Sequence, residues 1–170
     1  MPAIAWGKSP KITPAFKAKV IAISGTLGCD PSHLMSAMAF ETGETFSPSI
    51  KNPLSGATGL IQFMPSTAKG LGTTTAALAA MTAVQQLSFV EKYLKPFKGK
   101  MKTLSDVYMT ILFPKAVGKP AAFVLFKKPS KTYTQNKGLD ANGDGAVTKD
   151  EAAAKVHAKL VKGLGSSLLG

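Results

Sequence analysis

The chain has 170 residues, 45% of them hydrophobic, which is enough to bury one sizeable core in a single domain. Its formal net charge is +12, and all 21 strongly basic residues are lysines. Because nucleic-acid readers depend on arginine for bidentate contacts to phosphate and guanine, we expect no nucleic-acid partner. Lysines act as diffuse point charges, so the charge favours attraction to an anionic cell-envelope surface, or serves solubility alone.

Helical periodicity dominates the chain. Apolar residues recur at helical spacing in four segments, 16–27, 31–40, 75–94 and 104–113. Alternating strand patterns are nearly absent. Asp30 followed by Pro31 marks a helix start, because aspartate caps free amide groups and proline fits the first turn. We therefore expect a mainly α fold.

Glu41 stands directly after the apolar face of the segment 31–40, which carries Leu34, Met35 and Met38. A carboxyl group with apolar neighbours, near the negative end of a helix dipole, is harder to ionise than one in water. It can then hold a proton near neutral pH and give it to a leaving oxygen. Glu41 is thus a candidate general acid, and the alternative is a solvated glutamate in the last turn of a helix.

A loop follows this helix. Pro48, Pro53, Gly56 and Gly59 exclude a continuous helix and allow the backbone to pass close to a ligand. Gln62 then lies inside an apolar string, where an amide is costly unless its donors and acceptors are satisfied. Two interpretations of Gln62 stay open: a spacer bonded to backbone, or a group aimed at a substrate amide or hydroxyl.

The sequences Phe-Glu-Thr-Gly at 40–43 and Gly-Ala-Thr-Gly-Leu-Ile-Gln-Phe-Met-Pro at 56–65 resemble the phage-encoded soluble lytic transglycosylases. These are lysozyme-like enzymes that cut the glycan strands of peptidoglycan. The resemblance covers residues 30–68 well and continues weakly through 106–126. It implies a lysozyme-like fold with Glu41 as the catalytic acid/base. It also implies saccharide subsites lined by Ser55, Gly59, Gln62 and Phe63.

The chain departs from the family pattern in three places. Thr42 replaces the usual serine and keeps its hydroxyl. The stretch from Glu41 to Pro48 is about two residues longer than usual, so Glu44 is a rival for the acid role. We prefer Glu41, because Glu44 lies beyond a glycine in an expected loop. The resemblance places Tyr108 against the sugar at the cleavage site, but the family's following Asn-Ala-Gly is absent, so a packed core tyrosine is an equal alternative.

The mechanism depends on whether a second carboxylate exists, since most glycosidases use a pair. Residues 1–139 hold seventeen lysines and only five acids. This scarcity fits a mechanism in which Glu41 protonates the glycosidic oxygen and the N-acetyl group of the substrate stabilises the cationic centre. Deprotonated Glu41 then activates the 6-hydroxyl of the sugar, which gives the 1,6-anhydro product that the resemblance implies. Activation of water instead would make a muramidase, with Glu44 or Asp106 as helper, and a non-catalytic wall-binding module is a third possibility.

The segment 140–151 matches an EF-hand-like, twelve-residue calcium loop, with a glycine at the turn position. Ala146 is expected to bind through its carbonyl and Thr148 through a direct or water-mediated contact. The full set of expected oxygen ligands is Asp140, Asn142, Asp144, Ala146, Thr148 and Glu151. The alternative is an Asp/Gly-rich turn without metal. Segment 152–164 predicts a good exiting helix, whereas 133–139 predicts a short entering one. We expect a structural calcium ion that fixes the C-terminal helix, and no catalytic cofactor.

These features predict two parts in one fold. Residues 1–130 form the catalytic core, and 131–170 form the calcium loop and C-terminal helix packed on that core, with 127–131 as the seam. Lysines interrupt the N-terminus, so we expect synthesis in a host cytoplasm without a signal peptide, and action on the cell wall as an endolysin or virion component. The expected partner is the peptidoglycan glycan strand, and the protein is expected to be a monomer. Val156, Leu160 and Leu164 form a stripe that could touch a membrane or pack on the core.

Overall fold

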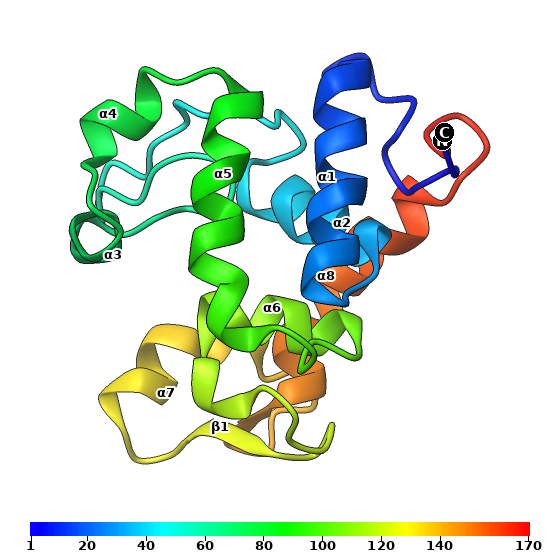
Figure 1. The fold of residues 1–170 in the computed structure, drawn as a ribbon. Coiled ribbons are helices and arrows are strands. Elements are labelled where there is room, and N and C mark those ends of the chain that lie inside the picture. Colours follow the sequence, from blue (N-terminus) through cyan, green and yellow to red (C-terminus); the bar gives the residue numbers. More distant parts are fainter.

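The computed structural model describes residues 1–170 and is mainly helical (Figure 1), as the sequence predicts. Eight α-helices are present: α1 Pro14–Leu27, α2 Pro31–Glu41, α3 Pro65–Gly70, α4 Thr75–Ala79, α5 Ala83–Leu94, α6 Leu104–Leu112, α7 Lys131–Asn136 and α8 Lys149–Gly163. Three short 3-10 helices are η1 Lys95–Phe97, η2 Pro114–Ala116 and η3 Lys137–Leu139. The single sheet pairs β1 Val124–Lys127 with β2 Ala146–Thr148. None of the helices combines the length and apolar character needed to cross a bilayer.

The start of α2 is the predicted one. The Asp30 side chain accepts a hydrogen bond from the backbone N–H of Ser32 at 2.7 Å, and Pro31 occupies the first turn. Every residue from Leu34 to Ala39 is buried. Glu41 is the last helical residue, so the helix delivers this carboxyl group to the edge of its own buried segment.

The periodic segment 75–94 forms two helices instead of one. Helix α4 ends at Ala79, and α5 begins after Thr82, which forms a capping box with Gln85. The Thr82 hydroxyl accepts from the Gln85 N–H at 3.1 Å, and the Gln85 side chain accepts from the Thr82 N–H at 2.9 Å. This reciprocal pair satisfies the free amides of a new helix start, which apolar periodicity alone does not reveal.

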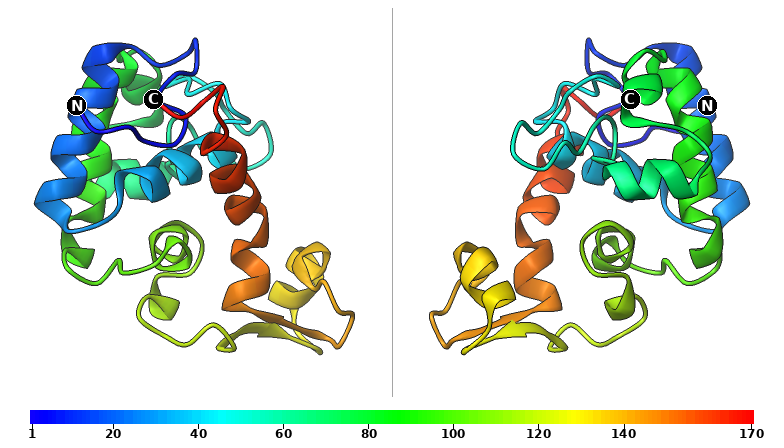
Figure 2. Two further views of the ribbon diagram at one scale, coloured as in Figure 1. Left: turned by 90° about the vertical axis from the view of Figure 1, so that its right-hand side faces the viewer. Right: turned by 90° about the vertical axis from the view of Figure 1, so that its left-hand side faces the viewer.

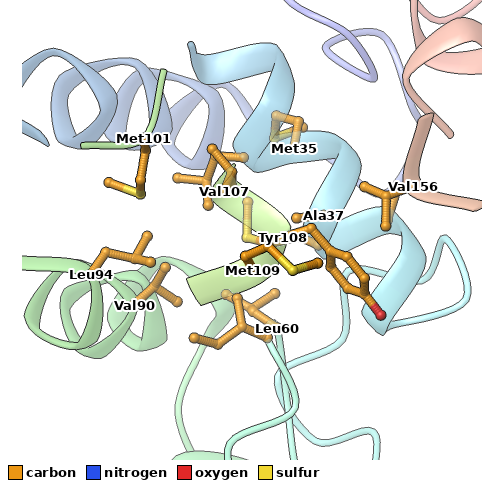
Figure 3. Close-up of a cluster of buried hydrophobic side chains, with 14 of the residues drawn as sticks. Met35, Ala37, Leu60, Val90, Leu94, Met101, Val107, Tyr108, Met109 and Val156 are labelled. Carbon is orange, nitrogen blue, oxygen red and sulfur yellow. The ribbon is translucent and has the colours of Figure 1, made fainter. Parts of the chain in front are cut away.

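One hydrophobic cluster of 32 buried residues forms the core. Figure 3 shows its centre, where Val107, Tyr108 and Met109 of α6 meet Met35 of α2 and Leu94 of α5. Burying a large apolar side chain of this kind stabilises the fold by about 1.5–3 kcal/mol. Helices α2 and α6 thus pack on one another through this core, and both carry predicted site residues.

Helix α8 belongs to the same core. Ala152, Ala153 and Val156 are buried members of the main cluster, and α8 packs against α2 and α6. Figure 2 shows α8 running from the small sheet to the end of the molecule where the C-terminus lies. There the backbone N–H of Ile4 donates to the carbonyl of Gly170 at 2.8 Å. Residues 131–170 therefore share one interior with residues 1–130.

Candidate active site

Glu41 carries the most informative electrostatics of the molecule. Burial raises the pKa of its carboxyl group from 4.5 to about 7. Neither carboxyl oxygen forms a hydrogen bond within the protein, yet neither is fully enclosed, so the group meets solvent at its tip. A carboxyl with this pKa is mostly protonated near pH 6 and about half protonated near pH 7, and its proton is free for a ligand.

Tyr108 lies near this carboxyl group, because its ring packs on Phe40, the residue before Glu41. Burial and the nearby Glu41 carboxylate both raise the pKa of Tyr108, so its phenol stays protonated at neutral pH. Its ring packs edge-on against Phe40, with 5.6 Å between ring centroids, and its hydroxyl points away from the hydrophobic cluster (Figure 3). Tyr108 is 6% exposed, so it is packed in the core, as in the second interpretation, and it also lies near Glu41.

Glu44 has a different environment from Glu41. Its carboxylate forms ion pairs with Lys159 and Lys162 of α8, at 2.7 Å in the case of Lys162. Hydrogen bonds from these two lysines lower the pKa of Glu44. It is therefore ionised at neutral pH and is a poor proton donor. The geometry favours Glu41 over its rival.

Asp106 is also paired with a lysine. Its carboxylate contacts the Lys149 ammonium at 2.5 Å, and both side chains are nearly inaccessible. Desolvation acts to raise the pKa of Asp106, but hydrogen bonds from Lys149 and the Gly118 N–H outweigh it, and the pKa is lowered. Asp106 also caps α6 through Thr103. This carboxylate holds α6 and α8 together and is not free to act on a ligand.

Gln62 lies in the Gly-rich loop with a left-handed backbone, φ 54°. Its side-chain N–H groups donate to the carbonyls of Ile50 and Gly59, at 3.2 and 3.1 Å. The amide is thus bonded to backbone, as in the first interpretation. Its oxygen makes no hydrogen bond within the protein and is not fully enclosed, so it stays able to accept one from a ligand. Gln62 and Phe63 line a small hollow together with Tyr93 of α5.

The three other residues expected to contact glycan differ in exposure: one is exposed and two are buried. Ser55 is exposed at the loop tip, where its hydroxyl accepts from the Ala57 N–H at 3.2 Å. Phe63 is 2% exposed and packs edge-on against Tyr93, so its side chain belongs to the core and offers little surface. Gly59 is buried with φ +83°, and a Cβ there would lie 2.3 Å from the Gln86 side-chain oxygen. Gly59 therefore serves the loop's shape.

In the predicted calcium loop, 140–151, the polar side chains accept hydrogen bonds from the loop's own backbone N–H groups. The Asp140 carboxylate accepts from the N–H groups of Gly143 and Gly145, at 2.8 and 2.9 Å, and from the Tyr133 hydroxyl at 2.7 Å. The side chains of Asn142 and Asp144 each accept from an amide two residues ahead, at 3.1 and 2.9 Å. These bonds hold the loop in a tight turn.

The end of this loop is joined to its beginning. Glu151 accepts from the Ala141 N–H at 2.8 Å with one oxygen, and from the Thr148 hydroxyl and N–H with the other. Thr148 and Glu151 form the capping box of α8, and β2 with Ala146 pairs with β1 and not with a second loop. No three acidic, histidine or cysteine side chains converge as a preassembled metal cluster.

The structure therefore brings Glu41 and Tyr108 together, and it places Gln62 and Gly59 in one loop. Glu41 lines none of the five surface hollows, and no hollow joins it to Gln62. Sequence reasoning missed Gln86, whose only signal is a polar residue on the apolar face of its helix. No family model matches this chain, and no curated protein matches it.

Proposed function

We propose that this protein is a peptidoglycan-degrading lytic transglycosylase of the phage type, with Glu41 as its single acid/base. The observation that supports this most directly is the Glu41 carboxyl group, which is half-buried, has a pKa of about 7 and lacks a hydrogen-bond partner within the protein. The mainly helical fold and the motifs at 40–43 and 56–65 agree with a lysozyme-like enzyme. The bond cleaved would be the MurNAc–GlcNAc linkage.

In this mechanism, protonated Glu41 gives its proton to the glycosidic oxygen as the bond to C1 breaks. The N-acetyl group of the substrate stabilises the developing cation, so no protein nucleophile is needed. Glu41, now a carboxylate, takes the proton of the 6-hydroxyl on the same sugar as that oxygen attacks C1. Tyr108, whose phenol stays protonated, lies near enough to Glu41 to feel its charge and would donate a hydrogen bond to the sugar.

Two observations favour one carboxylate over two. Glu44 is held by two lysines of α8, and Asp106 is buried against Lys149. Both are committed to ion pairs that a catalytic base or nucleophile would have to break. A muramidase that uses a second carboxylate is thus the weaker proposal.

The residues of the calcium loop fit a calcium ion by their chemistry. Their oxygens are hard ligands at alternating positions, and Gly145 has the left-handed φ of 87° that the turn demands. Asp140, Asn142, Asp144, Thr148, Glu151 and the Ala146 carbonyl would hold the ion. Because Glu151 also caps α8, a bound ion would fix the start of the helix that holds Glu44.

The experiment that tests the function is product analysis on purified peptidoglycan. Wild type should release muropeptides lighter by one water than the corresponding hydrolysis products, and Glu41→Gln should release none. Glu91→Gln, on α5, is the matched control and should match wild type. Only reducing ends would make the protein a muramidase, and wall binding without any product would make it a binding module.

A further inference from the structure

We infer that Gln86 is a positioning residue of the proposed glycan site. Its buried side-chain amide holds together the two ends of the loop between Pro48 and Leu60, and we call these two ends the neck of the loop. This inference rests on the proposed function, because it assumes that the loop contacts glycan. Gln86 is on α5, is 0% exposed, and is absent from the motifs that carry the family resemblance.

The side chain of Gln86 bonds to three separate segments. Its oxygen accepts from the Leu60 N–H at 2.7 Å. Its two N–H groups donate to the carbonyls of Pro48 and Leu78, each at 2.9 Å. Pro48 and Leu60 are the two ends of the loop, so one side chain ties both ends to the helical core. Leu78 is in α4, which the same amide anchors.

The loop backbone has room for the Gln86 side chain because the residue that faces it is a glycine. Gly59 packs directly on the Gln86 side chain, at a place where a Cβ would collide with it. On the other side of the neck, the Ile50 carbonyl accepts from the Gly59 N–H at 2.8 Å and from the Gln62 amide. Gln62 therefore closes the neck from within the loop, and Gln86 closes it from the helix.

Between the two ends the loop is open to solvent. Residues 51–55 are exposed, and Leu54 at the tip is 97% exposed. A loop with a fixed neck and an exposed tip presents its backbone and Ser55 in one orientation to a long, extended ligand. Preorganisation of this kind lowers the entropy that ordering the loop would cost on binding. Loss of the Gln86 bonds should therefore weaken substrate binding more than the chemical step.

The test compares Gln86→Glu with Gln85→Glu. The first variant keeps the shape and the acceptor for Leu60 but removes the donors to two carbonyls, whereas Gln85 is exposed and a glutamate there preserves the capping box. On purified glycan strands, Gln86→Glu should raise KM roughly tenfold with kcat changed less, and Gln85→Glu should leave both constants at wild-type values. Hydrogen exchange should show faster exchange of the Gly59 amide, which donates to Ile50, in Gln86→Glu only, because the variant keeps the acceptor for Leu60 but loses the two donors.

Two results would overturn the inference: unchanged KM in a folded Gln86→Glu variant, or a Leu60 amide that exchanges freely in wild type. The second measurement needs no variant, so it decides the matter even if Gln86→Glu does not fold. If wild type releases no product, the proposed function is refuted instead. The exchange rate of the Leu60 amide then still tests whether Gln86 holds the two ends of the loop together.

Discussion

The raised pKa of Glu41 predicts that removing this carboxyl group stabilises the protein at neutral and basic pH. In the unfolded chain the pKa of Glu41 returns to 4.5, whereas in the folded chain it is about 7. The folded state thus binds the proton more tightly between these two values. By linkage, the contribution of Glu41 to stability falls as the pH rises from about 4.5 through about 7.

The size of the effect follows from the same values. The pKa difference between 4.5 and about 7 corresponds to about 3 kcal/mol, which is the energy lost by burying the charged form. Glutamine has the shape of the protonated acid and carries no charge. Glu41→Gln should therefore match wild type near pH 4 and exceed its stability by about 2–3 kcal/mol near pH 8.

The assay is urea unfolding of both proteins at a series of pH values. The difference between their free energies of unfolding removes the contributions of the other titrating groups, which the two proteins share. Glu44→Gln is the matched control and should give the opposite sign. Since its lysine partners lower the pKa of Glu44, that carboxylate stabilises the fold above its ordinary pKa, and this contribution is lost as the pH falls through the lowered value. A Glu41→Gln difference that is constant with pH would show a solvated Glu41, and a wild type more stable than the variant near pH 8 would show a carboxylate that the fold stabilises. Either result would refute the general-acid argument.

Further predictions follow from the same contacts. Activity should fall as the pH rises above about 7, because the protonated form of Glu41 is depleted, and a pH–rate profile checks this. Lys149→Met leaves Asp106 buried without its partner and should cost about 3–5 kcal/mol in urea unfolding, part of which Asp106→Asn should restore. Phe63→Ala should cost about 3–5 kcal/mol, because Phe63 is a core residue, and unchanged stability would contradict that placement. Calcium at saturating concentration should raise the melting temperature of wild type by about 5 °C or more and leave Glu151→Gln nearly unchanged.

The features of this protein that depend on neighbouring residues could be predicted from its sequence alone. Asp30 and Pro31 start α2 because capping involves only neighbouring residues, and the buried apolar run that follows places Glu41 at a half-buried helix end. The Gly-rich loop follows from glycines and prolines that no helix accepts. The mainly helical class follows from periodicity that a residue's near neighbours reveal.

Only the tertiary structure decided which polar groups are engaged. Glu44 meets Lys159 and Lys162 across 115 and 118 residues of chain, and Asp106 meets Lys149 across 43. These pairs leave Glu41 as the carboxyl group of its region without a partner. Gln86 reaches back 38 residues to Pro48. Contacts between such distant positions leave no periodic or local trace in the sequence, because they arise only when packing brings separate helices to one place.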